Sequence, residues 1–282
     1  MRIPPIIYFM LVAPLVSSTA QNSFTISGRI QTTPAKKVNW NNAFIGIEYA
    51  NNQEKKVAFK NTFDYTRSTA NYDIKYSNWQ ENLNGFNEIK NEFSAKYAFT
   101  STTEIKAQIT PSLNFQETIG ISRVTILGGL ELHQIIGSNL VLIGGVSRSS
   151  FLGSPKIVPI GAITYQINKQ FSVSAGYPKS VIAYSNNERN QFRLLNIFNG
   201  TFYNLDTEKV LTNNVYAERL EISQITTAFE YERTVDQHWV VSFRGGYDSN
   251  KKYELTQKNN NVLTDLNIEN SPTFLFGLKY KH

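Results

Sequence analysis

The last twelve residues, 271–282, read SPTFLFGLKYKH and alternate between two kinds of side chain. Because successive side chains of an extended strand point to opposite faces, such alternation predicts a strand with one apolar face. The small or basic residues of the opposite face are Gly277, Lys279 and Lys281. The residues of the aromatic face are Phe274, Phe276, Leu278, Tyr280 and His282.

The same alternation returns along the chain, at residues 57–65, 93–99, 105–110 and 239–247. In each segment aromatic and aliphatic residues share one face, and mostly small or polar residues share the other. Strands of about 9 to 11 residues cross the hydrocarbon of a membrane when they are tilted. Helical periodicity of comparable strength is not found, so the sequence predicts an all-β fold.

The composition favours a barrel in a membrane. The chain has 15 Tyr and 18 Phe, yet its mean hydropathy is negative and no apolar run of helix-spanning length follows the first twenty residues. Lipid-facing and lumen-facing residues alternate in a transmembrane barrel, and their hydropathies cancel in the mean. A soluble, secreted β-sandwich that binds a ligand through its loops shares part of this composition and is the alternative.

The N-terminus predicts export. Arg2, the apolar stretch Ile6–Val16 and the small residues Ser18, Thr19 and Ala20 have the order of a signal peptide, which we expect to span residues 1–20. The sequence has no Cys, so a lipid-modified Cys, a disulfide and a thiolate metal site are excluded. We expect a short periplasmic lead-in at 21–39, or an extra strand at 24–30, and a barrel domain at 40–282.

Connection lengths predict an up-and-down antiparallel barrel. Short connections at 101–102, 136–139, 168–170 and 234–237 alternate approximately with long ones, as short periplasmic turns alternate with longer external loops. The length of the chain gives about twelve strands by this spacing. Fourteen is the alternative, and the choice depends on whether Pro178 interrupts a strand or only bulges it. The long connections are expected at 79–87, 205–214 and 250–270.

Two segments resemble known proteins. Gly176-Tyr177-Pro178-Lys179-Ser180, followed by Tyr184-Ser185, is similar to a strand-interrupting Gly-x-Pro segment in an uncharacterised family of Gram-negative outer-membrane barrels. The resemblance extends over residues 120–205 and the last strand, and it implies a fold and an outer-membrane location but no activity. Residues 274–282 resemble the C-terminal strand that the barrel-insertion machinery recognises, although His282 stands where Phe or Tyr is usual.

Polar residues on the inner faces of predicted strands are the candidates for contact with a solute. We expect lumenal side chains to set any charge preference of the barrel, and a bulge at Pro178 to direct two tyrosines. The stretch 126–167 is apolar on both faces and rich in Gly, which indicates either a narrow lumen or an apolar compartment. The candidates are Lys96, Lys106, Glu131, His133, Tyr177, Tyr184 and Arg244.

No catalytic residue, metal site or cofactor is predicted. Neither His133 nor His238 has a Ser two residues later, the spacing of outer-membrane lipid hydrolases, so hydrolysis is only an alternative. Basic residues are scattered, and the formal charge of +6 does not indicate nucleic-acid binding. We expect a non-enzymatic outer-membrane barrel, structural or a channel or transporter for small or hydrophobic solutes. Its partners would be outer-membrane lipids, the insertion machinery and an unknown small ligand.

Overall fold

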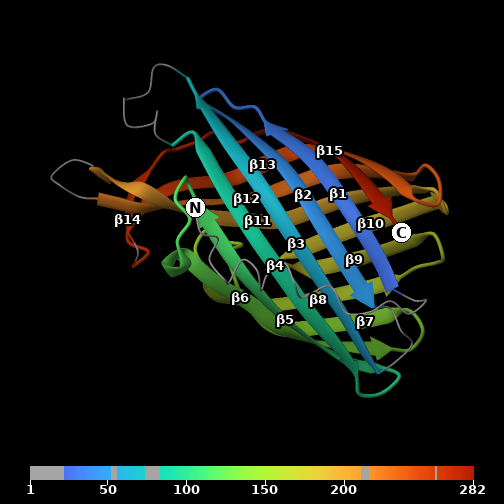
Figure 1. The fold of residues 1–282 in the computed structure, drawn as a ribbon. Helices are drawn as coiled ribbons and strands as arrows, with labels where there is room; N and C mark the ends of the chain where they lie inside the picture. Colours follow the sequence, from blue (N-terminus) through green and yellow to red (C-terminus); the bar gives the residue numbers. More distant parts are fainter. Residues whose placement is uncertain (1–21, 52–55, 74–82, 211–215, 258) are drawn as a thin grey trace.

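The computed structural model describes residues 22–51, 56–73, 83–210, 216–257 and 259–282, and their strands form a closed antiparallel β-barrel (Figure 1). Fourteen strands make the wall, each paired with its neighbours in the chain, and β15 pairs with β1 to close it. The strands are β1 Asn22–Thr33, β2 Val38–Asn51, β3 Val57–Tyr72, β4 Gly85–Ala98, β5 Thr103–Phe115, β6 Val124–Ile136, β7 Leu140–Ser149, β8 Lys156–Gln166, β9 Phe171–Tyr177, β10 Lys179–Asn187, β11 Asn190–Val210, β12 Tyr216–Thr234, β13 Trp239–Thr256, β14 Val262–Asp265 and β15 Ser271–Lys281. The short β14 pairs only with the end of β13 and lies outside the wall.

Pro178 decides the strand count. It forms the turn between β9 and β10, which pair antiparallel with Ser174 opposite Val181, so the expected bulge is wrong. Proline has no N–H to give to a strand ladder, and a turn accommodates it better than the middle of a strand does. The barrel therefore has fourteen strands and not twelve.

The first described strand completes the wall. Of the lead-in expected at 21–39, the described residues 22–33 instead form β1, which pairs along its length with β2 and β15. The backbone of Phe24 exchanges two hydrogen bonds with that of His282, at 3.0 and 2.9 Å. The extra strand that the sequence allowed at 24–30 thus lies at the seam of the barrel. The predicted signal peptide lies outside the described residues.

The outer surface of the wall is apolar. Phe274, Phe276 and Leu278 are between 41% and 49% exposed on it, in agreement with the alternation of the last strand. Asn61, a polar residue among the apolar residues of the outer face of β3, donates a 2.7 Å hydrogen bond to the Asn91 side chain of β4. A side-chain amide that faces lipid needs such a partner, because no water is there to satisfy it.

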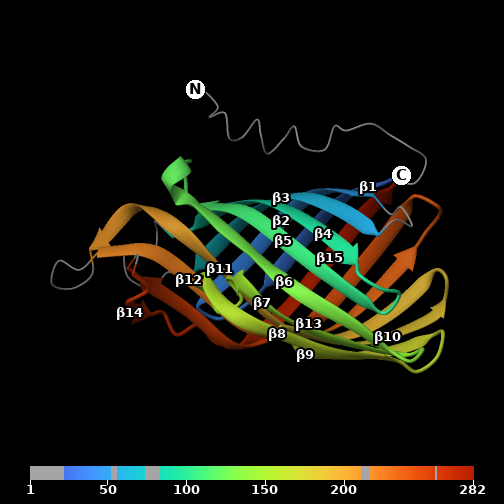
Figure 2. The ribbon, with the colours of Figure 1, turned by 90° about the horizontal axis from the view of Figure 1, so that it is seen from below.

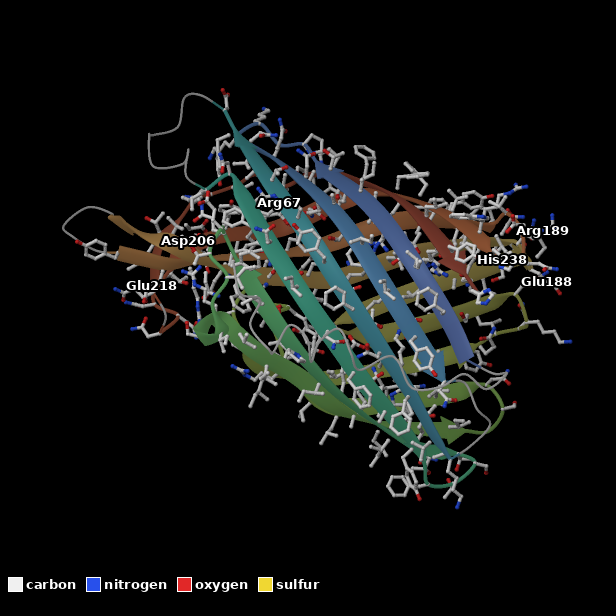
Figure 3. The ribbon with its side chains drawn as sticks, in the orientation of Figure 1. Arg67, Glu188, Arg189, Asp206, Glu218 and His238 are labelled. Atoms are coloured by element: carbon white, nitrogen blue, oxygen red, sulfur yellow. The ribbon has the colours of Figure 1, made fainter. Side chains whose placement is uncertain are left out.

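The two ends of the barrel differ. Figure 3 shows Glu188, Arg189 and His238 at one end, which we call the short-turn end, and Asp206 and Glu218 at the other, the long-loop end. The predicted short connections all join strands at the short-turn end. The predicted loops at 205–214 and 250–270 begin too early, because β11 continues to Val210 and β13 to Thr256. Of the predicted loop at 79–87, residues 79–82 lie outside the described part.

The wall has unequal height. β11, β12 and β13 have 21, 19 and 18 residues, whereas β7 to β10 have 10, 11, 7 and 9. Figure 2 shows β11 and β12 extending past the shorter strands. Beyond the low part of the wall, β11 touches β5 directly through a parallel bridge between Asn204 and Phe115. We call the side formed by β11, β12 and β13 the tall wall, and the side formed by β7 to β10 the short wall.

Apolar side chains fill the lumen at the long-loop end. Residues of β2, β3 and β4 meet residues of β11, β12 and β13 there, so the contacts cross the barrel. We call this set the outer cluster. It consists of Val38, Ala70, Leu83, Phe86, Tyr203, Leu205, Ala217, Leu220, Tyr253, Leu255 and Ile268.

Helical structure is minor in the described residues. The helix η2 (Ile121–Arg123) has three residues, and no described helix is long and apolar enough to span a membrane.

Candidate functional site: the barrel lumen

A cavity of about 540 Å³ occupies the middle of the lumen, below the outer cluster, and we call it the central cavity. Its lining comes from strands all around the wall, because alternate residues of each strand point inward. Trp40, Tyr203 and Tyr253 form its apolar end, next to the outer cluster. Five basic and three acidic side chains also line it: Arg29, Lys90, Arg148, Arg244, Lys251, Asp64, Glu88 and Glu92.

The aromatic end of the cavity is closely packed. Trp40 stacks on Phe86 with ring centroids 5.8 Å apart, and Phe86 stacks on Tyr203 at 4.7 Å. Tyr253 meets the edge of Trp40 at 5.8 Å and shares a 2.8 Å hydroxyl hydrogen bond with Tyr72. Offset and edge-on ring pairs of this kind stabilise a cluster beyond the burial of its area. The aromatic rings therefore form a closely packed end of the central cavity.

Arg29 lies at the other end of the cavity. Its guanidinium carbon is 3.6 Å from the centroid of the Phe44 ring, a cation–π contact. Two lumen-facing glycines make room for this arrangement. A Cβ at Gly277 would lie 3.2 Å from Cγ of Arg29, and a Cβ at Gly46 would lie 2.8 Å from Cζ of Phe44. Larger residues at either position would displace the cation or the ring beneath it.

Arg244 is held on the wall of the same cavity by Glu230. Its Nε and Nη2 donate to one oxygen of Glu230 at 2.8 and 2.5 Å, and Arg193 donates to the other oxygen at 2.5 Å. A neighbouring pair joins Lys279 to Glu232 at 2.8 Å. The Glu230 carboxylate thus binds the guanidinium groups of both Arg244 and Arg193, which keeps Arg244 in place. Because two positive charges share one negative charge, this set of three side chains carries a net positive charge.

Lys96, Lys106, Glu131 and His133 face the lumen closer to the short-turn end. Lys106 donates to Glu131 at 3.2 Å, and the imidazole Nε2 of His133 lies 2.9 Å from the other oxygen of Glu131. Lys96 pairs with Glu104 at 3.2 Å. These charged side chains are paired with one another or with Glu104 near the short-turn end of the lumen. Neither Lys96 nor Lys106 is therefore left without a carboxylate partner for a solute to replace.

The two tyrosines expected near the lumen are on the wrong face. Tyr184 stacks on Phe192 and is 39% exposed on the outer surface, and Tyr177 packs edge-on against Phe198 on the same side. The expectation relied on a bulge at Pro178. Since Pro178 instead forms a turn, the inward residues of β10 are Val181 and its alternates, and both tyrosines point to lipid.

Sequence reasoning missed Arg29, Arg193 and Glu230. Arg29 lies in the segment expected to lead into the barrel, so it was not assigned a face. Arg193 and Glu230 lie on opposite strands of a hairpin, paired in register with each other. The alternation of residues 228–234, with Glu230 and Glu232 on one face, was the available signal for the carboxylates.

The histidines make structural contacts. His133 is bonded to Glu131 as described, and the Nδ1 of His238 lies 2.9 Å from the carbonyl oxygen of Lys281, to which it donates when that nitrogen is protonated. The His238 ring stacks on Tyr280 at 5.5 Å. Among the described residues, neither imidazole has a hydrogen bond to a serine hydroxyl, and no three His, Asp or Glu residues converge in a way that could hold a metal ion.

Residues 104–281 match the family described as "Domain of unknown function (DUF6268)". The chain belongs to this family. The match contains the Pro178 region and the last strand, so the predicted resemblance to an uncharacterised barrel family is confirmed. Among the curated proteins, none matches this chain significantly.

Solved structures share the barrel architecture at low sequence identity. The translocator domain of autotransporter NalP from Neisseria meningitidis is 8% identical, with a TM-score of 0.43 over 95% of this chain and 91% of that one. A TodX deltaS2S3 mutant monoaromatic hydrocarbon channel is 11% identical, with a TM-score of 0.48 over 94% and 91%. A Pseudomonas aeruginosa FadL homologue is 7% identical, with a TM-score of 0.46 over 93% and 89%. The similarity is one of fold class alone.

Proposed function

We propose that this barrel resides in the outer membrane and admits a small solute into the central cavity through a lumen that is closed at rest. The observation that carries the proposal is a cavity of about 540 Å³ bounded by the outer cluster. Pockets of several hundred Å³ with a few placed polar groups are typical of small-molecule sites. A structural barrel would be expected to fill its lumen with packed side chains.

The outer location follows from the character of the wall and of its ends. An apolar outer surface, inward-facing charges and short turns at one end are typical of outer-membrane barrels. We propose that the first twenty residues direct export and that Phe274, Phe276, Leu278, Tyr280 and His282 are read during insertion. The mature protein should fractionate with the outer membrane and migrate faster unboiled than boiled in detergent gels. Extraction by carbonate would contradict this location.

The closed lumen makes a prediction for conductance. Trp40 belongs to the aromatic end, where its ring contacts Phe86 and Tyr253. In planar bilayers the wild-type barrel should conduct in rare, small steps. Trp40→Ala should raise the open probability or step size severalfold, because it removes the largest ring of the aromatic end.

The control for that experiment is Trp239→Ala, which removes an indole from the outer face near the short-turn end. It should leave conductance at the wild-type level. Both variants must keep the unboiled gel mobility of the folded barrel. A large, steady wild-type current that Trp40→Ala does not change would show an open pore, and it would rule out the gated lumen.

A further inference from the structure

We infer that the central cavity takes an amphipathic monoanion, with a carboxylate at Arg29 and Arg244 and an apolar, preferably aromatic, body against Trp40, Tyr203 and Tyr253. This inference rests on the proposed function and names the substrate class of the same cavity. Its first support is the state of Arg29. Among the described residues, its guanidinium has no hydrogen bond, and its Nε is inaccessible to solvent and without a partner.

A partly buried guanidinium without acceptors is costly, because its N–H groups lose water and gain nothing in exchange. Most other lumenal cations of the described chain have a carboxylate partner, as Lys90, Lys106 and Lys279 do. Asp64 attracts Arg29 electrostatically, but no nitrogen of Arg29 lies within 4.0 Å of a carboxylate oxygen of Asp64. The two terminal nitrogens of Arg29, Nη1 and Nη2, have no hydrogen-bond partner in the described chain and are not inaccessible as Nε is, so they are available to an acceptor that enters the cavity.

Arg244 supplies a second set of donors. Its two bonds to Glu230 use Nε and Nη2 and leave Nη1 without a bond to a described residue. Arg29 and Arg244 repel each other, and the attraction of Arg29 to Glu230 is weaker than this repulsion. Glu230 itself pairs with Arg193 and Arg244. A bound anion would relieve the repulsion between these guanidinium groups. Planar guanidinium groups also match the geometry of a carboxylate.

The spacing of the two ends gives the ligand its length. Phe44, which lies under Arg29, and Trp40, which forms the aromatic end, are four residues apart on β2. At about 3.3 Å per residue they are separated by roughly 13 Å along the strand. A molecule that spans this distance carries its anionic group at one end and its apolar group at the other. The positive excess among the lining residues disfavours an amine in the same place.

The test uses three soluble probes of one shape: 4-phenylbutyrate, 4-phenylbutanol and 4-phenylbutylamine. Binding to the folded, detergent-solubilised barrel is measured by isothermal titration calorimetry. We expect 4-phenylbutyrate to bind best and Arg29→Gln to weaken it about tenfold, the size of one charged hydrogen bond. Arg29→Lys should restore part of the affinity, and 4-phenylbutanol should bind equally to wild type and Arg29→Gln.

Arg189→Gln is the matched control, since it removes one guanidinium from a turn at the short-turn end (Figure 3). It should leave all three affinities unchanged, and every variant must keep the gel mobility of the folded barrel. Equal binding of the three probes, insensitive to Arg29→Gln, would refute the anionic class and leave the solute cavity standing. No binding by any probe, together with an open wild-type pore in bilayers, would refute the proposed function itself.

Discussion

One carboxylate holds the turn before β13. Oδ1 of Asp236 accepts hydrogen bonds from the backbone N–H groups of Trp239 at 2.7 Å and His238 at 2.8 Å. These bonds favour the ionised carboxylate and hold its pKa below the ordinary value of 3.8. Asp236 is in a turn at the short-turn end, so water and pH reach it directly. Its contribution to folding must therefore depend on pH.

The direction of that dependence follows from the lowered pKa. A group whose pKa is lower in the folded state stabilises the fold above its ordinary pKa, and this contribution is lost as the pH falls through the folded value. At neutral pH, Asp236→Ala should lower the urea midpoint slightly, because the ionised cap is absent. At about pH 2 wild type and variant should unfold at nearly the same urea concentration. An equal gap at both pH values would mean that the carboxylate charge plays no part.

At the level of single residues, alternation predicts a face but not a partner. It placed Lys96, Lys106, Glu131 and Arg244 in the lumen, because each lies on a regular strand. Their pairing depends on the register between strands, which no local pattern encodes. That Arg29 has no hydrogen-bond partner could not be predicted for the same reason. Its isolation is visible only once β1 is closed against β15.

At the scale of the strands, the tall wall contacts the connection between β7 and β8 of the short wall at a glycine of β11, Gly200. A Cβ at Gly200 of β11 would overlap the carbonyl oxygen of Ser150 and lie 2.6 Å from that of Phe151. The Ser150 hydroxyl also donates to the Gly200 carbonyl oxygen at 3.0 Å. The connection between β7 and β8 thus lies flat on β11.

Gly200→Ala should therefore push that connection away and destabilise the barrel by about 1–3 kcal/mol, as overpacking does. Gly144→Ala is the control, because a Cβ at Gly144 would meet nothing within 4 Å. It should stay within roughly 0.5 kcal/mol of wild type. Urea unfolding of the two variants in the same detergent or lipid gives the comparison. Equal midpoints would remove Gly200 from this role.

The number of strands was the feature of the fold that the sequence predicted least well. Residues 171–187 alternate nearly without a break, so the pattern allows one long strand or a hairpin. Pro178 restricts the backbone at one position, but a bulge and a turn both satisfy that restriction. Only the pairing of β9 with β10 decides between them. The error in the faces of Tyr177 and Tyr184 has the same origin.

For the whole molecule, the barrel class was predictable and the filling of its lumen was not. The composition and the alternation of the strands are sums of local signals, and they are recorded in the sequence. The outer cluster joins residues such as Val38 and Leu255, which are far apart in the chain and meet across the lumen. Whether a barrel is open or closed depends on such contacts. The glycine-rich stretch 126–167 indicated a narrow or apolar interior, but the outer cluster comes from other strands, and beside Leu127 the stretch lines the central cavity with polar residues such as Ser147 and Arg148.

The short wall also has a consequence for the surrounding lipid. The seven residues of β9 extend about 23 Å, and a tilt of about 40° reduces their height to roughly 18 Å, below the usual apolar band of about 25 Å. At the last residue of β9, the ring of Tyr177 contacts the rings of Phe151 and Phe198. Lipids beside β9 must therefore compress their acyl chains or let the barrel lean, and those beside the long strands need not. The protein would deform one sector of its bilayer only, and it should insert faster into vesicles of shorter-chain phosphatidylcholine than into longer-chain ones.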